Sequence, residues 1–86
     1  MTDITIYTTE SCGYCRRAKA LLNKMSMAFN EVDVTHDPAE RARMMQRAGG
    51  KRTVPQIFIG DTHVGGCDDL YALNAQGGLD LLLETK

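Results

Sequence analysis

Two cysteines, Cys12 and Cys15, are separated by two residues. They lie where a segment with alternating apolar residues is followed by a segment with a helical pattern. A C-x-x-C pair at a junction of strand and helix is typical of thiol redox chemistry. Free backbone N–H groups and the positive end of the helix dipole favour a thiolate at Cys12. Cys15 lies one helical turn deeper. We therefore predict that Cys12 attacks and that Cys15 resolves the mixed disulfide.

Zinc binding is the competing use of a C-x-x-C pair, because zinc sites commonly combine two such pairs, or one pair with two histidines. The second half of such a site would have to come from His63 and Cys67, or from His36, at no usual spacing. Both histidines are therefore expected to be plain surface residues. No metal ligands are predicted from spacing.

Positive charge is concentrated after the cysteine pair. Residues 16–52 hold nine of the ten basic residues and four of the eleven acidic ones. This segment is either a set of solvated helix faces or a basic rim that attracts small anions. Arg16, Arg17 and Lys19 either add positive potential beside Cys12 or are ordinary surface charge.

The hydrophobic pattern of the first half predicts the elements that hold the cysteines. Residues 4–8 alternate with a period of two and predict a strand. One helical face follows the cysteines, formed by Ala18, Leu21, Leu22 and Met25. Residues 29–34 read as a second strand, so the three segments predict a parallel strand–helix–strand unit.

The second half predicts a helix, a hairpin and a last helix. A helix start is indicated by Asp37 as N-cap, Pro38 at the first helical position and Glu40 three residues after the cap. Gly49-Gly50 indicates the end of this helix. The apolar run 56–59 predicts a buried strand, and Gly60-Asp61 suits a two-residue turn into an antiparallel strand.

The chain is expected to close with a helix that begins after Gly65-Gly66 and breaks at Gly77-Gly78. Asp68 and Asp69 fall in its first turn, where acidic side chains favour the helix dipole. Residues 79–83 are expected to form a short terminal turn or helix. The predicted order is βαβαββα, an α/β fold with a four-stranded mixed sheet flanked by helices, in a single domain over residues 1–86.

Composition limits the function classes. The 86 residues are 43% hydrophobic and 24% charged, as in one small soluble domain, and the net charge of −1 argues against a general nucleic-acid binder. No apolar run approaches the roughly 18 residues that span a membrane, and no signal peptide is evident. Three cysteines cannot all pair within the chain, so a reducing compartment, the cytoplasm, is expected.

Four segments together carry a family resemblance, namely Tyr7-Thr8, Cys12-Gly13-Tyr14-Cys15, Thr53-Val54-Pro55 and Gly65-Gly66-Cys67-Asp68-Asp69-Leu70. With them the chain resembles the glutaredoxins, especially the small bacterial dithiol type, over residues 3–82. The resemblance implies a thioredoxin-like fold and a glutathione-dependent thiol–disulfide oxidoreductase. Cys12 would then attack a protein disulfide or take glutathione from a protein–glutathione mixed disulfide.

The resemblance also implies the partners of the reaction. Glutathione would be the reductant and co-substrate, and glutathione reductase with NADPH would serve the family's oxidised form through it. Disulfide-bonded or glutathionylated proteins would be the substrates, and supplying electrons to ribonucleotide reductase is one recurrent role of the family. No nucleic acid or membrane is expected as a partner, and the reduced protein is expected to be a monomer.

The glutathione site follows from the same resemblance. The segment Thr53-Val54-Pro55 looks like the family's cis-proline loop, whose Val54 backbone would pair with the glutathione cysteine. Asp68, Asp69 and the N–H groups of the last helix would hold the γ-glutamyl end, although either acid could serve only as a helix cap. The residues assigned to glutathione are Tyr14, Lys51, Arg52, Thr53, Val54, Pro55, Gly66, Cys67, Asp68 and Asp69.

Lys51 or Arg52 could meet the glycyl carboxylate, or could be cations that keep the preceding turn soluble. Cys67 could form a regulatory mixed disulfide, but a small apolar residue is the simpler interpretation. Thr9 stands where the family often has a lysine, so one expected cation beside the thiolate is absent.

Gly13 stands where the family's commonest motif has proline. Glutaredoxins with a small residue there can hold a [2Fe-2S] cluster between two subunits, with the first cysteine and glutathione as ligands. The alternative function is therefore a cluster-bridged dimer in which Cys12 is the ligand. A thioredoxin-like reductant that ignores glutathione is a third alternative, opposed by Tyr14 and the Asp68-Asp69 pair.

Overall fold

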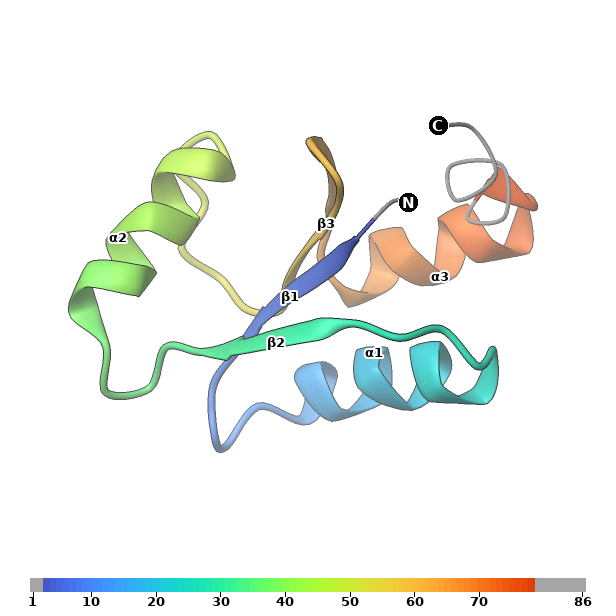
Figure 1. The fold of residues 1–86 in the computed structure, drawn as a ribbon, viewed down its shortest axis with the longest axis horizontal. Helices are drawn as coiled ribbons and strands as arrows, with labels where there is room; N and C mark the ends of the chain where they lie inside the picture. The colour runs from blue at the N-terminus through green and yellow to red at the C-terminus, as the bar shows by residue number, and fades with distance from the viewer. Residues whose placement is uncertain (1–2, 79–86) are drawn as a thin grey trace.

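The computed structural model describes residues 3–78, which form seven elements in the predicted order (Figure 1). They are β1 (Ile4–Thr8), α1 (Gly13–Lys24), β2 (Asn30–Asp33), α2 (Pro38–Arg47), β3 (Gln56–Ile59), β4 (Thr62–Gly65) and α3 (Cys67–Ala75). None of the helices in this part of the chain is long and apolar enough to cross a membrane.

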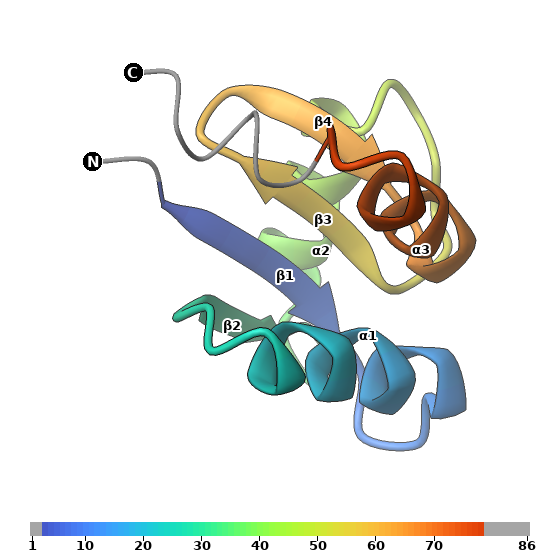
Figure 2. The same ribbon diagram turned by 90° about the vertical axis from the view of Figure 1, so that its right-hand side faces the viewer.

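The four strands form one mixed sheet in the order β2-β1-β3-β4 (Figure 2). Strand β1 pairs in parallel with β2 and antiparallel with β3, and β3 pairs antiparallel with β4. The end of β1, the start of β3 and the end of β4 therefore meet at one end of the sheet. The segments that carry Cys12, Pro55 and Gly66 follow or precede these strand ends, so the topology brings three distant parts of the sequence together.

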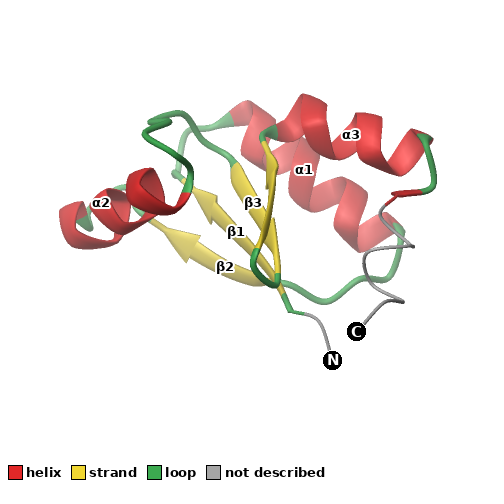
Figure 3. Ribbon diagram, turned by 90° about the horizontal axis from the view of Figure 1, so that it is seen from above, coloured by secondary structure: helices red, strands yellow, loops and turns green. Residues whose placement is uncertain are grey.

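Helices cover both faces of the sheet, as predicted: α1 and α3 lie on one face and α2 on the other (Figure 3). Side chains of a strand point alternately to the two faces of the sheet, so each face has its own apolar cluster. In β3, Ile57 and Ile59 belong to one cluster and Phe58 belongs to the other. Leu22 and Leu70, both fully buried, bring α1 and α3 into the first cluster, and Met44 brings α2 into the second.

Local signals fix the limits of α2 as predicted. The Asp37 side chain accepts a hydrogen bond from the Glu40 N–H at 3.1 Å, and Pro38 occupies the first helical position. The helix ends at a cap on Ala48, and Gly49 and Gly50 follow with φ angles of +68° and +96°. These angles favour glycine, so this pair turns the chain toward β3.

Strand β2 is shorter at both ends than the predicted 29–34. Phe29 packs against the first apolar cluster from outside the strand. Val34 is buried, and its N–H still donates to the Thr8 carbonyl at 2.9 Å. Strand β4 in turn extends to Gly65, one residue beyond the predicted end. The expected terminal turn over residues 79–83 lies outside the described residues.

Candidate active site

Cys12 is the N-cap of α1, in an extended backbone conformation. Its Sγ accepts a hydrogen bond from the Cys15 N–H at 3.1 Å and donates one to the Val54 carbonyl at 3.6 Å. The first turn of α1 contains no acidic residue. The thiol is half-buried, so it is held by the helix N-terminus while remaining open to a substrate.

Cys15 is buried, with an exposed fraction of 1%. Burial, reinforced by the hydrogen bond with Cys12, raises the pKa of the Cys15 thiol from 9.0 to about 12. The two thiols therefore differ in environment although they lie one turn apart, since Cys12 is accessible and Cys15 keeps its proton inside the fold.

The loop before β3 is held by three side chains that bind successive carbonyl groups. Arg41 of α2 donates to the Arg52 carbonyl at 2.9 Å, and Gln56 donates to the Thr53 carbonyl at 2.9 Å. The Val54 carbonyl accepts from Cys12, and the Val54–Pro55 peptide bond is cis, as the family resemblance implied. The loop is thus positioned from α2, from β3 and from the start of α1.

Gln56 and His63 support this loop, and neither role was predicted from the sequence. Gln56 is 1% exposed, and because its Nε2 donates to Thr53, its Oε1 must accept the 2.7 Å hydrogen bond from His63 Nε2. His63 also stacks on Phe58 at 4.8 Å between ring centroids. The expectation that His63 is a plain surface residue is wrong, whereas His36 is exposed and contacts Glu10 at 3.2 Å. The available sequence signal was Gln56, a polar residue at the start of the otherwise apolar strand β3.

A hollow of about 280 Å³ lies beside the cysteine motif and gathers most of the predicted glutathione residues. Its lining residues are Tyr14, Thr53, Pro55, Gly66, Cys67, Asp68 and Asp69. Val54 stands between two lining residues and contacts Cys12 through its carbonyl group. Lys51 and Arg52 are exposed and do not line the hollow, so the structure does not place them with the others.

The two acidic residues at the start of α3 have different environments. Asp69 Oδ2 accepts a hydrogen bond from the Gly66 N–H at 3.0 Å, which caps the helix. A side chain at Gly65, whose φ is +119°, would collide with this carboxylate. Asp68 and Asp69 are both exposed and both line the hollow. One Asp69 oxygen is engaged by the Gly66 N–H, so Asp68 is the acid that serves no cap and keeps its whole carboxylate available to a ligand.

Comparison with known proteins agrees with this geometry. The glutaredoxin family profile matches residues 4–64, and the chain is 54% identical to glutaredoxin 3 of Escherichia coli (strain K12) over 84 residues, covering 98% of this chain and 100% of that protein. The chain belongs to the glutaredoxin family.

Solved glutaredoxin structures share its fold. The solution structure of the Brucella melitensis glutaredoxin superposes with a TM-score of 0.85 at 56% identity, covering 99% of this chain and 91% of that one. The buckwheat glutaredoxin–glutathione complex superposes with a TM-score of 0.85 at 30% identity, covering 95% and 76%. The four-stranded sheet with its three described helices is therefore the thioredoxin-like fold.

Cys67, the third cysteine of this glutaredoxin, is 5% exposed and packs in the apolar cluster between the sheet, α1 and α3. Burial raises the pKa of its thiol. Cys67 also lines the hollow, so it has a packing role beside the site. Among the described residues no group of three or more potential metal ligands is found.

The cations after the cysteine motif are not equivalent. Lys19 pairs with Glu31 at 2.9 Å, and Thr8 donates to the same carboxylate oxygen at 2.7 Å. The Thr8 hydroxyl and then Lys19 hold the pKa of Glu31 below its ordinary range. The charge of Lys19 is thus compensated locally, whereas Arg16 and Arg17, near the start of α1, are exposed.

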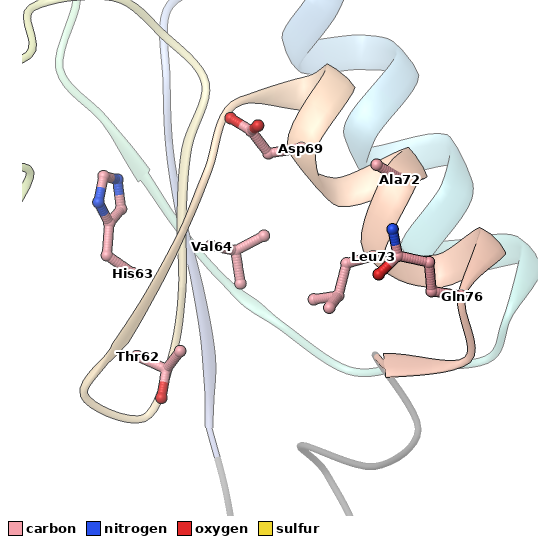
Figure 4. A pocket seen from close by; sticks show the side chains of 7 residues that line it. All are labelled: Thr62, His63, Val64, Asp69, Ala72, Leu73 and Gln76. Atoms are coloured by element: carbon pink, nitrogen blue, oxygen red, sulfur yellow. The ribbon is translucent and has the colours of Figure 1, made fainter.

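A second hollow, also of about 280 Å³, lies between β4 and α3 (Figure 4). Val64 points toward Leu73 across it, whereas His63 lies on the opposite side of the strand. Asp69 borders both hollows, but no cysteine lines this one. The hollow beside Tyr14 is therefore the one of these two that adjoins the cysteine motif.

Proposed function

We propose that this protein is a glutathione-dependent dithiol oxidoreductase that reduces protein disulfides and protein–glutathione mixed disulfides. The observation that carries the proposal is the placement of the Cys12 thiol at the N-terminus of α1, between the Cys15 N–H and the Val54 carbonyl. A hollow lined by seven of the ten predicted glutathione residues adjoins the cysteine motif.

In the proposed reaction, the Cys12 thiolate attacks the glutathione sulfur of a protein–glutathione mixed disulfide. The substrate S–S bond breaks, the protein leaves as a thiolate that takes a proton from water, and glutathione becomes disulfide-bonded to Cys12. The thiolate of a second glutathione then attacks this disulfide. It releases oxidised glutathione and the Cys12 thiolate, which the Cys15 N–H and the helix dipole stabilise.

Cys15 takes part when the substrate is a protein disulfide. Cys12 first forms a mixed disulfide with one substrate sulfur, and Cys15 then attacks Cys12 and expels that sulfur as a thiolate. The raised pKa of Cys15 keeps it protonated while Cys12 reacts, and its proton passes to the substrate thiolate that it expels in the second step. The resulting Cys12–Cys15 disulfide is reduced by two molecules of glutathione.

Four features of the site support glutathione as the partner. The exposed Asp68 carboxylate suits the ammonium group of the γ-glutamyl end, and the N-terminus of α3 suits its carboxylate. The Val54 backbone would pair with the cysteinyl part, with Tyr14 beside it. Lys51 and Arg52 could reach the glycyl carboxylate only with their long side chains, since they lie outside the lining of the hollow. A relative of known structure, from buckwheat, is a complex with glutathione.

The experiment that tests this function is turnover of a glutathionylated peptide with glutathione, glutathione reductase and NADPH. Cys12→Ser should abolish it, and the matched Cys15→Ser should keep it but lose the reduction of a peptide disulfide. Turnover by Cys12→Ser would refute the assignment of the nucleophile. Loss of both activities in Cys15→Ser would refute the division of roles between the two thiols.

The partners in the cell follow as proposals from this chemistry. Substrates would be glutathionylated or disulfide-bonded proteins, with ribonucleotide reductase as the candidate electron acceptor. Glutathione reductase would act indirectly, by regenerating glutathione. The cytoplasm is the proposed location, because a glutathione pool and free thiols both require a reducing compartment.

A cluster-bridged dimer is the second candidate, and Gly13 favours it. A Cβ at Gly13 would meet nothing within 4 Å, so packing within the monomer does not require glycine there. Cys12 is one thiolate ligand per chain, and two chains with two glutathione molecules would complete the four ligands of a [2Fe-2S] cluster. Anaerobic reconstitution with iron, sulfide and glutathione should give a visible absorption band and a dimer, and Gly13→Pro should lose both. Absence of the band from the unaltered protein would eliminate this candidate.

A further inference from the structure

Tyr14 separates two hollows at the start of α1. On one side lies the hollow with Pro55, Gly66 and Asp68. On the other side a hollow of about 310 Å³ is lined by Gly13, Tyr14 and Arg17. Cys12 directly precedes this segment, so the reactive sulfur has a hollow on either side of the neighbouring tyrosine. A mixed disulfide also has two halves, glutathione and a polypeptide.

Arg17 and two tyrosines form a continuous exposed patch on this second side, which we call the Arg17 patch (Tyr14, Arg17 and Tyr71). The Arg17 guanidinium carbon lies 6.0 Å from the Tyr14 ring centroid and 5.7 Å from that of Tyr71. The Tyr71 hydroxyl donates to the Arg17 carbonyl at 3.3 Å, which ties α3 to α1. The patch is therefore built from both helices.

The tyrosines of the patch are exposed to an unusual degree. Tyr14 and Tyr71 are the large hydrophobic residues that stand exposed within residues 3–78, at 58% and 38%. Aromatic side chains beside an arginine are enriched where proteins bind proteins, because they supply contact area at little cost in entropy. This composition suits a polypeptide partner.

The charge of the patch sets the kind of polypeptide. Arg16 and Arg17 are both exposed, and the salt bridges of the described residues leave them without a carboxylate. The first turn of α1 holds no acidic residue, and Asp68 lies in the other hollow. The patch is thus positive and complementary to acidic side chains.

We propose that the Arg17 patch docks the polypeptide half of the substrate and favours acidic residues beside the reactive cysteine. This inference rests on the proposed function. With glutathione in the hollow beside Asp68, the polypeptide would lie across Gly13 and Arg17. Attack by Cys12 on the glutathione sulfur then releases the polypeptide thiolate from the patch, and water supplies its proton.

The test compares two glutathionylated peptides that differ only in carrying aspartates or lysines on both sides of the cysteine. The readout is the ratio of their kcat/KM values, because a ratio cancels any effect of a variant on the reactivity of Cys12. The unaltered protein should prefer the acidic peptide by about three-fold at low salt, and the preference should shrink as salt is added.

Arg17→Glu should reverse the preference, whereas Lys24→Glu should retain it. Lys24 makes the matched control because it is exposed at the other end of the same helix and undergoes the same change of charge. Equal loss of preference in both variants, or no preference in the unaltered protein, would overturn the inference. Circular dichroism of both variants checks that each remains folded.

The mixed disulfide of glutathione with 2-mercaptoethanol separates failure of this inference from failure of the proposed function, because it has no polypeptide half. If the unaltered protein turns over this small substrate but shows no preference between the peptides, only the docking surface is refuted. If it turns over none of the three substrates, the proposed function itself is refuted and the docking surface with it.

Discussion

Cys12 and Cys15 are the same residue type one helical turn apart, and burial gives them different roles. Cys12 caps the helix with a half-buried thiol, and Cys15 faces the apolar core with 1% exposure. The position of Cys12 as the helix cap imposes this arrangement, because the cap lies at the surface and the first turn of α1 packs inward. The order of events at the two sulfurs follows from this difference in access.

Alkylation of the reduced protein should therefore be selective. Iodoacetamide near pH 7.5 should modify Cys12 and leave Cys15 and Cys67 as free thiols, because burial both shields these two and raises their pKa. Peptide mapping by mass spectrometry measures the result. Modification of Cys15 at a rate comparable to that of Cys12 would contradict the described environments.

Asp68 and Asp69 should respond differently to substitution by alanine. Asp68→Ala should raise the KM for glutathione about five-fold, since it removes the exposed carboxylate proposed to meet the ammonium group. Asp69→Ala should lower the free energy of unfolding by about 1 kcal/mol, because it removes the hydrogen bond from the Gly66 N–H. Urea unfolding and steady-state kinetics of both variants check the pair. If Asp69→Ala had the larger effect on KM and the smaller effect on the free energy of unfolding, Asp69 would bind glutathione and Asp68 would cap the helix, contrary to this assignment.

Residues with local signatures could be predicted from the sequence, and residues defined by distant contacts could not. The spacing of Cys12 and Cys15 carried the redox prediction by itself. The roles of Gln56, His63 and Arg41 depend on which strands and helices become neighbours, and nothing in their immediate sequence specifies that. The choice between Asp68 and Asp69 as the cap was left open for another reason: the cap is a contact between residues three apart, and two adjacent acids stand in the first turn of α3.

Among the elements, the loop before β3 is the one on which the site depends most. It presents the Val54 backbone to Cys12, and the carbonyl groups on either side of Thr53 are held from α2 and α1. Gln56 holds Thr53 itself from inside the sheet. The loop is thus positioned by side chains from three elements rather than by a regular hydrogen-bond ladder.

Gln56→Leu should lower the free energy of unfolding by about 1–3 kcal/mol, since it leaves the Thr53 carbonyl and His63 Nε2 without their partner. It should also raise the KM for glutathione, because the Val54 backbone becomes less well positioned. Gln46→Leu, on the exposed surface of α2, is the matched control and should change stability by about 0.5 kcal/mol or less. Equal effects of the two substitutions would show that the buried hydrogen bonds contribute little.

The type and order of the elements were predictable because their signals are local. The cap at Asp37 and the glycine pair after Ala48 bounded α2 correctly. The predicted limits differ from the observed ones by one residue at both ends of β2 and at the C-terminal end of β4. A strand ends where its partner strand ceases to pair with it. The sequence of one strand alone does not contain that information.

At the scale of the whole molecule, the antiparallel pairing of β1 with β3 assembles the site. Tyr7 pairs with Gln56, so the chain leaving β1 toward Cys12 and the chain entering β3 from Pro55 lie at the same end of the sheet. The mixed sheet was predicted, but the strand order β2-β1-β3-β4 was not. The family resemblance placed Val54 at the glutathione site, but the direct contact between Cys12 and Val54 was not predicted.

Stability should fall at alkaline pH in the reduced protein. Unfolded cysteines ionise near pH 9.0, whereas the folded Cys15 retains its proton to about pH 12. Its contribution to stability is therefore fully present below pH 9 and is lost as the pH rises from 9 toward 12. Urea unfolding at pH 7.5 and pH 10, in the presence of reductant, should show a loss about 1 kcal/mol smaller for Cys15→Ser than for the unaltered protein. Identical losses would mean that Cys15 ionises in the folded state as it does in the unfolded chain.

The most direct test of the central claim traps the first chemical step. Cys15→Ser is mixed with a glutathionylated peptide in the absence of free glutathione, and the products are followed by intact mass spectrometry and peptide mapping. The account predicts release of the reduced peptide and one glutathione attached to Cys12. Attachment of the peptide instead of glutathione to Cys12, or recovery of the glutathione on Cys67, would contradict the claim that Cys12 attacks glutathione held beside Tyr14 and Asp68.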